Sequence, residues 1–298
     1  MLRCSLVLFA ALAAILAPSA AATRHASAFP VTIHAANGDI VVKTRPTRVI
    51  SLSPTGTEDL FAVGAGSQVI AVDNDSDYPK GVPRTSLSGF TPNVEAIAGY
   101  KPDLVVVSND IDNVVASLQK LGISVLLEPA ADNIAQAYDE IRQIGSATGH
   151  ALQAKTVVGG MESTLTKLLR SVPKAQRHQT VYHELDPTYY SATSATFIGR
   201  IYKLFGFKNI ADAADTTHSG YPQLSAEYIV ASSPDIVVLA DSVCCAQTAA
   251  SVAARPGWSG VAAVQHHRVI AVNDSVASRW GPRIVDFVRA IANVARKK

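Results

Sequence analysis

The sequence predicts an α/β protein made of two Rossmann-like lobes, each built on a parallel sheet, with a single long helix joining them. Strand and helix patterns alternate in both halves of the 298-residue chain, which is typical of a sheet covered on both faces. One helix–turn–strand unit occurs at Asn93–Val107 and again at Ser225–Leu239. Residues 150–172 show no strand pattern and carry apolar residues at helical intervals, as expected of a connector.

The repeated unit has the same local chemistry in both copies. Asn93 and Ser225 are helix-capping residues, and Glu95 and Glu227 occupy the first turn of the short helix that each begins. A Pro-Asp turn then ends the helix, and an apolar, β-branched run predicts a buried parallel strand. The competing interpretation is a chance likeness between two ordinary α/β units.

The remaining elements of the N-terminal half follow from turn and capping signals. Asn37-Gly38-Asp39 predicts the turn of a hairpin, and Ser53-Pro54 predicts the start of a helix. The expected elements before residue 150 are a hairpin over 29–43, strands over 48–52, 68–72 and 123–127, helices over 55–63, 111–121 and 133–148, and the first repeat unit.

The second half repeats the alternation, and three structural regions result. The lobes are predicted at 30–149 and 173–298, with the connecting helix at 150–172. Gly159-Gly160 lowers helix propensity in its middle, so it either kinks there or consists of two helices. The expected elements after it are strands over 180–185 and 268–272, helices over 196–205 and 281–296, a partly helical stretch over 252–264, and the second repeat unit.

The N-terminus predicts a secretory signal peptide over residues 1–22. Arg3 precedes an apolar run at Leu6–Leu16, and the small residues at Pro18–Ala22 suit cleavage. Cys4 lies before the apolar run, whereas a lipoprotein signal would place it at the cleavage point. We therefore expect an exported protein that is periplasmic or in the cell envelope and soluble after cleavage; the alternative is a membrane anchor.

Composition and cysteine spacing restrict the partners and metal sites. A net charge of +2 without a Lys/Arg run gives no indication of a nucleic-acid partner. Cys244 and Cys245 are adjacent, so they form either a vicinal disulfide or two thiols in a loop feature, not a structural zinc site. No clustering of His and carboxylate residues predicts any other metal site.

Aromatic and hydroxyl residues gather in loops expected at the carboxyl ends of strands, where open α/β sheets bind ligands. Such loops fit a bulky, partly apolar ligand held between the lobes, and Arg279 is expected to pair with an anionic group on it. The alternative for Tyr221 and Trp280 is that they cap the edge of the core. The candidate ligand-binding residues are Tyr78, Phe90, Tyr189, Tyr221, Arg279 and Trp280.

No catalytic residue is predicted. Ser51 and Ser53 lack the Gly-x-Ser-x-Gly elbow, and Gly64-Ala-Gly66 follows a helix, where a dinucleotide loop would follow a strand. The repeated carboxylates are more informative. A favourable interaction with the helix dipole explains each of Glu95 and Glu227 by itself. One carboxylate at the same position in each lobe could also form ion pairs with two arginines of a two-fold symmetric partner.

Five segments carry a resemblance that covers about residues 48–294, and they lie at 48–58, 76–79, 93–97, 101–106 and 225–229. Together they resemble the Fe/B12-type periplasmic binding proteins of ABC importers. The resemblance implies a class III binding protein with a rigid connecting helix and a ligand between the lobes. It also implies that Glu95 and Glu227 dock to arginines on the two permease subunits.

The resemblance further implies a non-enzymatic, monomeric protein that delivers its ligand to an ABC permease dimer with its ATPase. The ligand is a metal chelate carried as cargo, with no resident cofactor: a ferric siderophore, haem or cobalamin. B12 binders line their cleft with several tryptophans, whereas this chain has only Trp258 and Trp280. For haem, His218 or Tyr221 would be the axial ligand. The alternatives are an extracytoplasmic enzyme, a metallochaperone, or a ligand-sensing partner of a membrane receptor.

Overall fold

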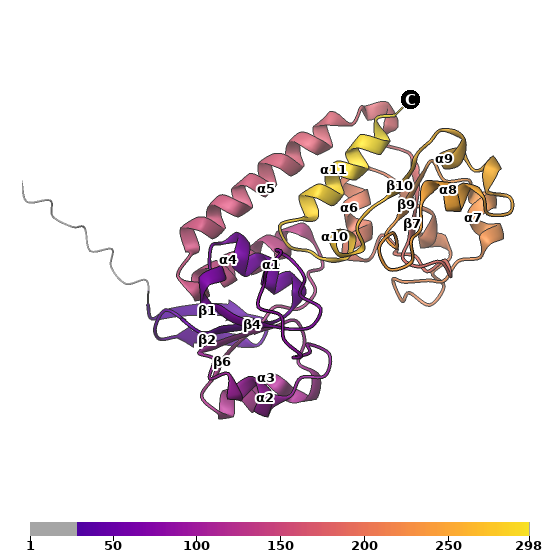
Figure 1. Ribbon diagram of the computed structural model, residues 1–298. Helices are drawn as coiled ribbons and strands as arrows, with labels where there is room; N and C mark the ends of the chain where they lie inside the picture. Colours follow the sequence, from indigo (N-terminus) through magenta and orange to yellow (C-terminus); the bar gives the residue numbers. More distant parts are fainter. Residues whose placement is uncertain (1–28, 298) are drawn as a thin grey trace, which may run out of the picture.

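The computed structural model describes residues 29–297 and shows two lobes connected by one long helix (Figure 1). The signal peptide predicted at 1–22 lies outside the described residues. Within 29–297, no helix combines the length and apolarity that crossing a bilayer requires. The two-lobed α/β prediction is confirmed.

The N-terminal lobe contains a four-stranded parallel sheet in the order β4-β3-β5-β6. Alternate strand residues face two apolar clusters: α1 and α4 cover one face, and α2 and α3 the other. The predicted antiparallel hairpin lies at the lobe's edge. The elements are β1 Val31–Ala35, β2 Gly38–Val42, β3 Val49–Leu52, α1 Pro54–Ala62, β4 Val69–Val72, α2 Val94–Gly99, β5 Leu104–Val107, α3 Val114–Lys120, β6 Ser124–Leu127 and α4 Ile134–Thr148.

The C-terminal lobe repeats this topology with a second four-stranded parallel sheet, in the order β10-β9-β7-β8. If β7 corresponds to β3 and β9 to β5, the two sheets have the same strand order. The elements are β7 Thr180–Glu184, α6 Phe197–Phe205, β8 Lys208–Asn209, α7 Ala226–Ser232, β9 Ile236–Leu239, α8 Ala249–Ala253, α9 Ala262–Gln265, β10 Val269–Ala271, α10 Asp274–Ser278 and α11 Ile284–Ala295.

The repeated unit has equivalent hydrogen bonds in both lobes. Asn93 caps α2 by accepting from the Ala96 amide, and Ser225 caps α7 in the same way. The aspartate of each Pro-Asp turn then binds the start of the neighbouring strand. Asp103 accepts from the amide and hydroxyl of Thr47 at 2.8 and 3.1 Å. Asp235 accepts from the same two groups of Thr180 at 2.8 and 3.0 Å.

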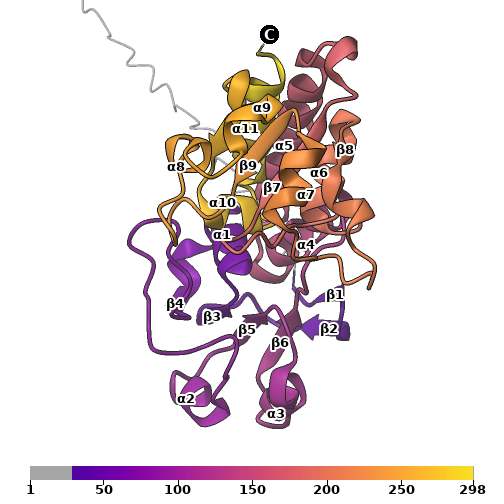
Figure 2. The ribbon, with the colours of Figure 1, turned by 90° about the vertical axis from the view of Figure 1, so that its right-hand side faces the viewer.

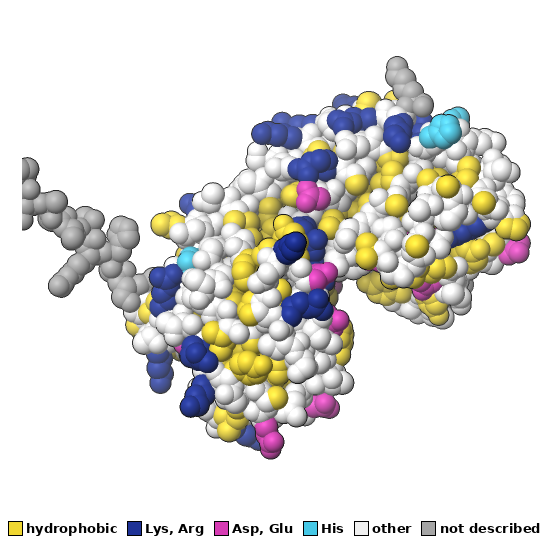
Figure 3. Space-filling view, viewed as in Figure 1, with side chains coloured by type: hydrophobic (Ala, Val, Ile, Leu, Met, Phe, Trp, Pro, Cys, Tyr) yellow, Lys and Arg dark blue, Asp and Glu magenta, His cyan; other side chains and the backbone are white. Residues whose placement is uncertain are grey.

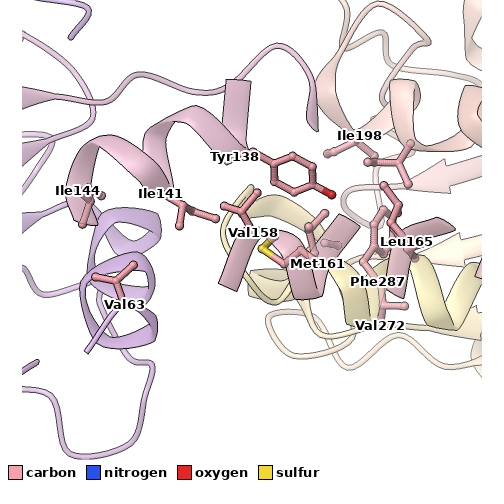
Figure 4. Close-up of a cluster of buried hydrophobic side chains, with 14 of the residues drawn as sticks. Val63, Tyr138, Ile141, Ile144, Val158, Met161, Leu165, Ile198, Val272 and Phe287 are labelled. Atoms are coloured by element: carbon pink, nitrogen blue, oxygen red, sulfur yellow. The ribbon is translucent and has the colours of Figure 1, made fainter. Parts of the chain in front are cut away.

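The connector is a single helix, α5 Ala151–Ser171, that runs without interruption through Gly159 and Gly160. Its buried face comprises Ala154, Val158, Met161 and Leu165, whereas Leu152 is 78% exposed. This face belongs to one apolar cluster that extends from α4 in the first lobe to α11 in the second (Figure 4). The two lobes therefore share a continuous core along α5.

Three boundaries differ from the sequence prediction. The helix expected at 111–121 begins with a 3-10 turn, because Asp112 and Asn113 adopt left-handed backbone angles before α3. The closing helix begins at Ile284, and the separate helix α10 precedes it. The stretch expected at 252–264 divides into α8, a 3-10 turn at Trp258–Gly260, and α9. The 3-10 turn before α3 is Ile111–Asn113, and the remaining 3-10 turns are Gly66–Gln68, Lys174–Gln176 and Ile210–Ala213.

Candidate functional site: a cleft between the lobes

A cleft of about 320 Å³ lies between the lobes, which are separated by a visible hollow (Figure 3). The first lobe contributes residues 130–132, which follow β6. The second lobe contributes residues 195–198, at the start of α6, together with His218, Tyr221 and Trp280. Both lobes thus form its walls, as expected of a ligand site at the carboxyl ends of parallel strands.

Tyr221 and Trp280, two of the predicted ligand residues, lie together on this cleft. The Tyr221 side chain is 49% exposed, and Trp280 is half-buried. His218, the other candidate axial ligand, lines the same wall. Two aromatic faces and an imidazole in one cleft suit a flat, partly apolar molecule that carries a metal.

Trp280 is held in place by the opposite lobe. Its indole Nε1–H donates to Oε2 of Glu140 on α4 at 2.6 Å. Glu140 is buried, and burial raises the pKa of its carboxyl to about 8, with the hydrogen bond from Trp280 acting in the opposite direction. The bond restricts the orientation of the indole of Trp280, which lines the cleft.

Two more buried carboxyls surround Glu140. Burial raises the pKa of Glu128 to about 9, and Glu140 and Asp59 raise it further. Burial likewise raises the pKa of Asp59, with contributions from Glu140 and Glu58. Each of the three acids has one oxygen without a hydrogen-bond partner among the described residues. Even so, no group of three or more His, Cys, Asp or Glu side chains within 29–297 is arranged to hold a metal.

Arg279 bonds within the protein across the lobe boundary. Its Nη1 donates to Glu58 at 2.9 Å and to Asp77 at 2.7 Å. Arg283 donates to both oxygens of the same Glu58 and lies 4.1 Å above the ring of Tyr78. The corner between α10 and α11 is therefore bound to α1 of the first lobe, and the predicted ligand contact of Arg279 stays a prediction.

The other aromatic candidates lie away from the Tyr221–Trp280 wall. Tyr78 packs beneath Arg283 on the α1 side, and Phe90, 65% exposed, follows β4 in the first lobe. Tyr189 stacks on the buried Trp258, with centroids 6.3 Å apart, and Arg255 lies against both rings. Tyr189 thus packs against the second lobe's core, and ligand contact by these three residues stays a prediction.

Glu95 and Glu227 are both exposed, in the first turns of α2 and α7. Hydrogen bonds from its own amide and from Ser225 lower the pKa of Glu227. The helices α2 and α7 lie at the far ends of the two lobes, on the side opposite α5 (Figures 1 and 2). The arrangement presents one exposed carboxylate on each lobe.

Sequence reasoning missed Glu58, Glu140 and Arg283. A signal for Glu140 was present, because it shares the apolar face of α4 with Ala137, Ile141 and Ile144. An acidic residue on a buried helix face indicates either a partner or a perturbed carboxyl. The sequence did not show which partner, since Trp280 lies 140 positions away.

Comparison with solved structures identifies the fold as that of class III periplasmic binding proteins. The vitamin B12-binding protein BtuF of Vibrio cholerae superposes with a TM-score of 0.69 and 22% identity, over 85% of this chain and 99% of that one. The haem-binding protein HutB of the same organism has a TM-score of 0.72 and 21% identity, over 83% and 98%. At such identities the likeness concerns the fold alone.

Sequence comparison shows the family. The periplasmic binding protein model matches residues 49–276, and the chain therefore belongs to this family. It is 34% identical to the uncharacterized ABC transporter substrate-binding lipoprotein YvrC of Bacillus subtilis, over 89% of this chain and 85% of that protein. It is also 34% identical to a cobalamin-binding protein of Halobacterium salinarum, over 90% and 74%. The protein is a substrate-binding component of an ABC importer.

Proposed function

We propose that the protein binds a metal chelate with a large flat face between its lobes and delivers it unchanged to an ABC permease. A corrinoid or haem fits this description better than a ferric siderophore. The observation that carries this proposal is the aromatic wall of Tyr221 and Trp280 in a cleft that both lobes form. The named activity of the 34%-identical Halobacterium relative favours cobalamin. We further propose an exported, monomeric protein that acts in the cell envelope.

Haem is the second candidate, because His218 and Tyr221 line the same wall. A neutral imidazole or a phenolate is a usual axial ligand of haem iron. Burial raises the pKa of Tyr221, so an iron ion would have to displace its proton on binding. A haem complex would then lose its Soret shift in His218→Ala or Tyr221→Phe, whereas cobalamin affinity would depend on ring contacts alone.

Tryptophan fluorescence tests the proposal, because the chain has only two tryptophans and they differ in environment. Trp258 is fully buried, whereas Trp280 borders the cleft. Titration with cyanocobalamin, haemin and a ferric siderophore should quench the emission saturably with at least one ligand. Trp280→Phe should remove most of the quenching and leave the Trp258 signal. No saturable response to any member of the panel would refute the proposed ligand class.

A further inference from the structure

The segment 241–247 follows β9 and contains a disulfide between the adjacent residues Cys244 and Cys245. It leaves the same sheet edge as the loop after β7 that leads to the cleft residues 195–198. In Figure 2 the segment before α8 and the loop between β4 and α2, which contains Phe90, lie on the same side of the molecule, one on each lobe. The disulfide thus lies in a loop at the carboxyl edge of the second lobe's sheet, the edge from which the chain also leads to the cleft residues 195–198.

Hydrogen bonds hold this segment rigidly against α10. The amides of Val243 and Cys244 donate to the two oxygens of Asp274 at 2.9 and 2.7 Å. The Ser242 hydroxyl donates to the Val272 carbonyl at 2.5 Å. Four residues after Asp274, a rise of about 6 Å along the helix, Ser278 already lines the cleft. The position of the disulfide is therefore coupled to the cleft wall.

A contribution to global stability does not account for this disulfide. A disulfide stabilises a fold mainly by restricting the unfolded chain, and the effect grows with the length of the loop that it closes. Cys244 and Cys245 are separated by a single position, so the restriction is the smallest that a disulfide can impose. Metal ligation is excluded as well, because the ligand form of cysteine is the thiolate.

The surface around the disulfide is apolar and open. Val243 is 67% exposed, and Cys244 is exposed beside it. Of the nine large hydrophobic side chains that are exposed within residues 29–297, five lie in loops that follow the sheets' carboxyl edges. These five are Tyr78, Phe90, Tyr190, Tyr221 and Val243. Exposed apolar groups that gather in loops at the carboxyl edges of the sheets, the edges that supply the cleft residues, indicate a binding surface.

We propose that the Cys244–Cys245 disulfide and Val243 form a contact surface for the flat face of the ring ligand, on the rim of the second lobe. The inference rests on the proposed function and adds a ligand contact to it. A disulfide carries no charge and no strong hydrogen-bonding group, and its polarisable sulfurs contact π-systems favourably. Two thiols would rotate freely and add weak donors, so the oxidised form is the better ring contact.

The test compares three variants with the wild-type protein in titrations with cyanocobalamin and haemin. Cys244→Ala with Cys245→Ala removes the disulfide, and Val243→Ala trims the same surface with the disulfide intact. Leu152→Ala, on α5 and 78% exposed, is the matched control for loss of an exposed apolar side chain. We expect the double variant to bind about tenfold more weakly, Val243→Ala to show a smaller loss, and Leu152→Ala to equal the wild type.

The outcomes separate this inference from the function on which it rests. Thermal unfolding of each variant should stay within the wild-type range, because the disulfide closes so short a loop. If the wild-type protein binds and the folded double variant binds equally well, the disulfide surface is refuted and the transport function stands. If the wild-type protein binds no ligand, the proposed function itself fails.

Discussion

At the scale of single residues, the most unusual group is the set of buried acids next to Trp280. Asp59, Glu128 and Glu140 have pKa values raised mainly by burial. Glu140 at the same time accepts the indole hydrogen bond that orients Trp280. A protein that keeps carboxyls protonated beside its cleft gains a polar anchor for an aromatic ring without placing a full negative charge there.

The raised pKa of Glu140 predicts a pH-dependent stability. Its folded pKa of about 8 lies above the unfolded value of 4.5, so the native state binds more protons in that window. Stability should therefore fall as pH rises from about 4.5 to 8 and level off above it. Urea unfolding between pH 5 and 9 should show this fall, and Glu140→Gln should make it shallower.

The matched control for this prediction is Glu162→Gln, which alters an exposed carboxylate on α5. It should leave the pH profile parallel to that of the wild-type protein. An unchanged slope in Glu140→Gln would mean that Glu140 is ionised in the native state throughout. Stability that rises between pH 5 and 8 would contradict the effect of all three buried acids.

Residue-scale prediction from the sequence succeeded where the interaction is local. The caps Asn93, Ser225 and Ser53 were all predicted, because a capping side chain bonds an amide within three residues. Contacts across the chain were not predictable. Glu58 binds Arg279 and Arg283 from more than 200 positions away, and no local pattern specifies such a pair.

At the scale of elements, α5 and its neighbour α4 show two opposite uses of glycine. A Cβ atom added at Gly159 or Gly160 would meet no atom within 4 Å, so these glycines serve no packing role. At Gly145 on α4, an added Cβ would lie 2.3 Å from the Cβ of Ala154 on α5. Only a glycine allows the two helices to approach so closely.

This contrast gives a paired prediction. Gly159→Ala with Gly160→Ala should stabilise the protein by roughly 1–2 kcal/mol, because alanine loses less backbone entropy in a helix. Gly145→Ala should destabilise it by about 1–3 kcal/mol, since overpacking forces the helices apart. Urea unfolding measures both. Destabilisation by the double alanine change would show that α5 needs flexibility at its middle.

Sequence periodicity located nearly every element but not all their ends. The two glycines in the sequence left open whether the connector kinks or consists of two helices. The structure shows one helix, because burial of its apolar face outweighs the low helix propensity of glycine. That face comprises Ala154, Val158, Met161 and Leu165. The helix α10 was missed because five residues are too few for a periodic signal. Its cap, Asn273, was the available clue.

At the scale of the whole molecule, the two lobes are tied at three places. They share one apolar cluster, Glu58 binds two arginines from the other lobe, and Trp280 bonds to Glu140. Removing one partner of a buried charge pair of this kind strongly destabilises the folded protein. These links favour a molecule in which the lobes move little when the cleft is filled.

The exposed pair Glu95 and Glu227 predicts a separation of binding from delivery. Glu95→Ala with Glu227→Ala should leave ligand affinity unchanged, because neither residue is among those lining the cleft, and should abolish uptake into cells that carry the permease. Each single change should reduce uptake partially. Fluorescence titration and radiolabelled ligand uptake provide the two measurements.

The control for delivery is Glu162→Gln, which alters an exposed carboxylate on α5, the helix that lies on the side opposite α2 and α7. Uptake by this variant should equal that of the wild-type protein. Normal uptake by the double Glu95 and Glu227 variant would refute permease docking through these residues. A large loss of affinity in that variant would instead assign them to the ligand site.

The uninterrupted α5 has one further consequence. Its 21 residues, about 31 Å of helix, fix how far apart the lobes hold α2 and α7. Inserting four residues in the exposed stretch near Gly159 would lengthen this helix by about 6 Å and rotate one lobe relative to the other by about 40°. We expect the two exposed glutamates, Glu95 and Glu227, then to lose their match to the two arginines of a two-fold symmetric permease, so that the variant still binds its ligand and fails in uptake.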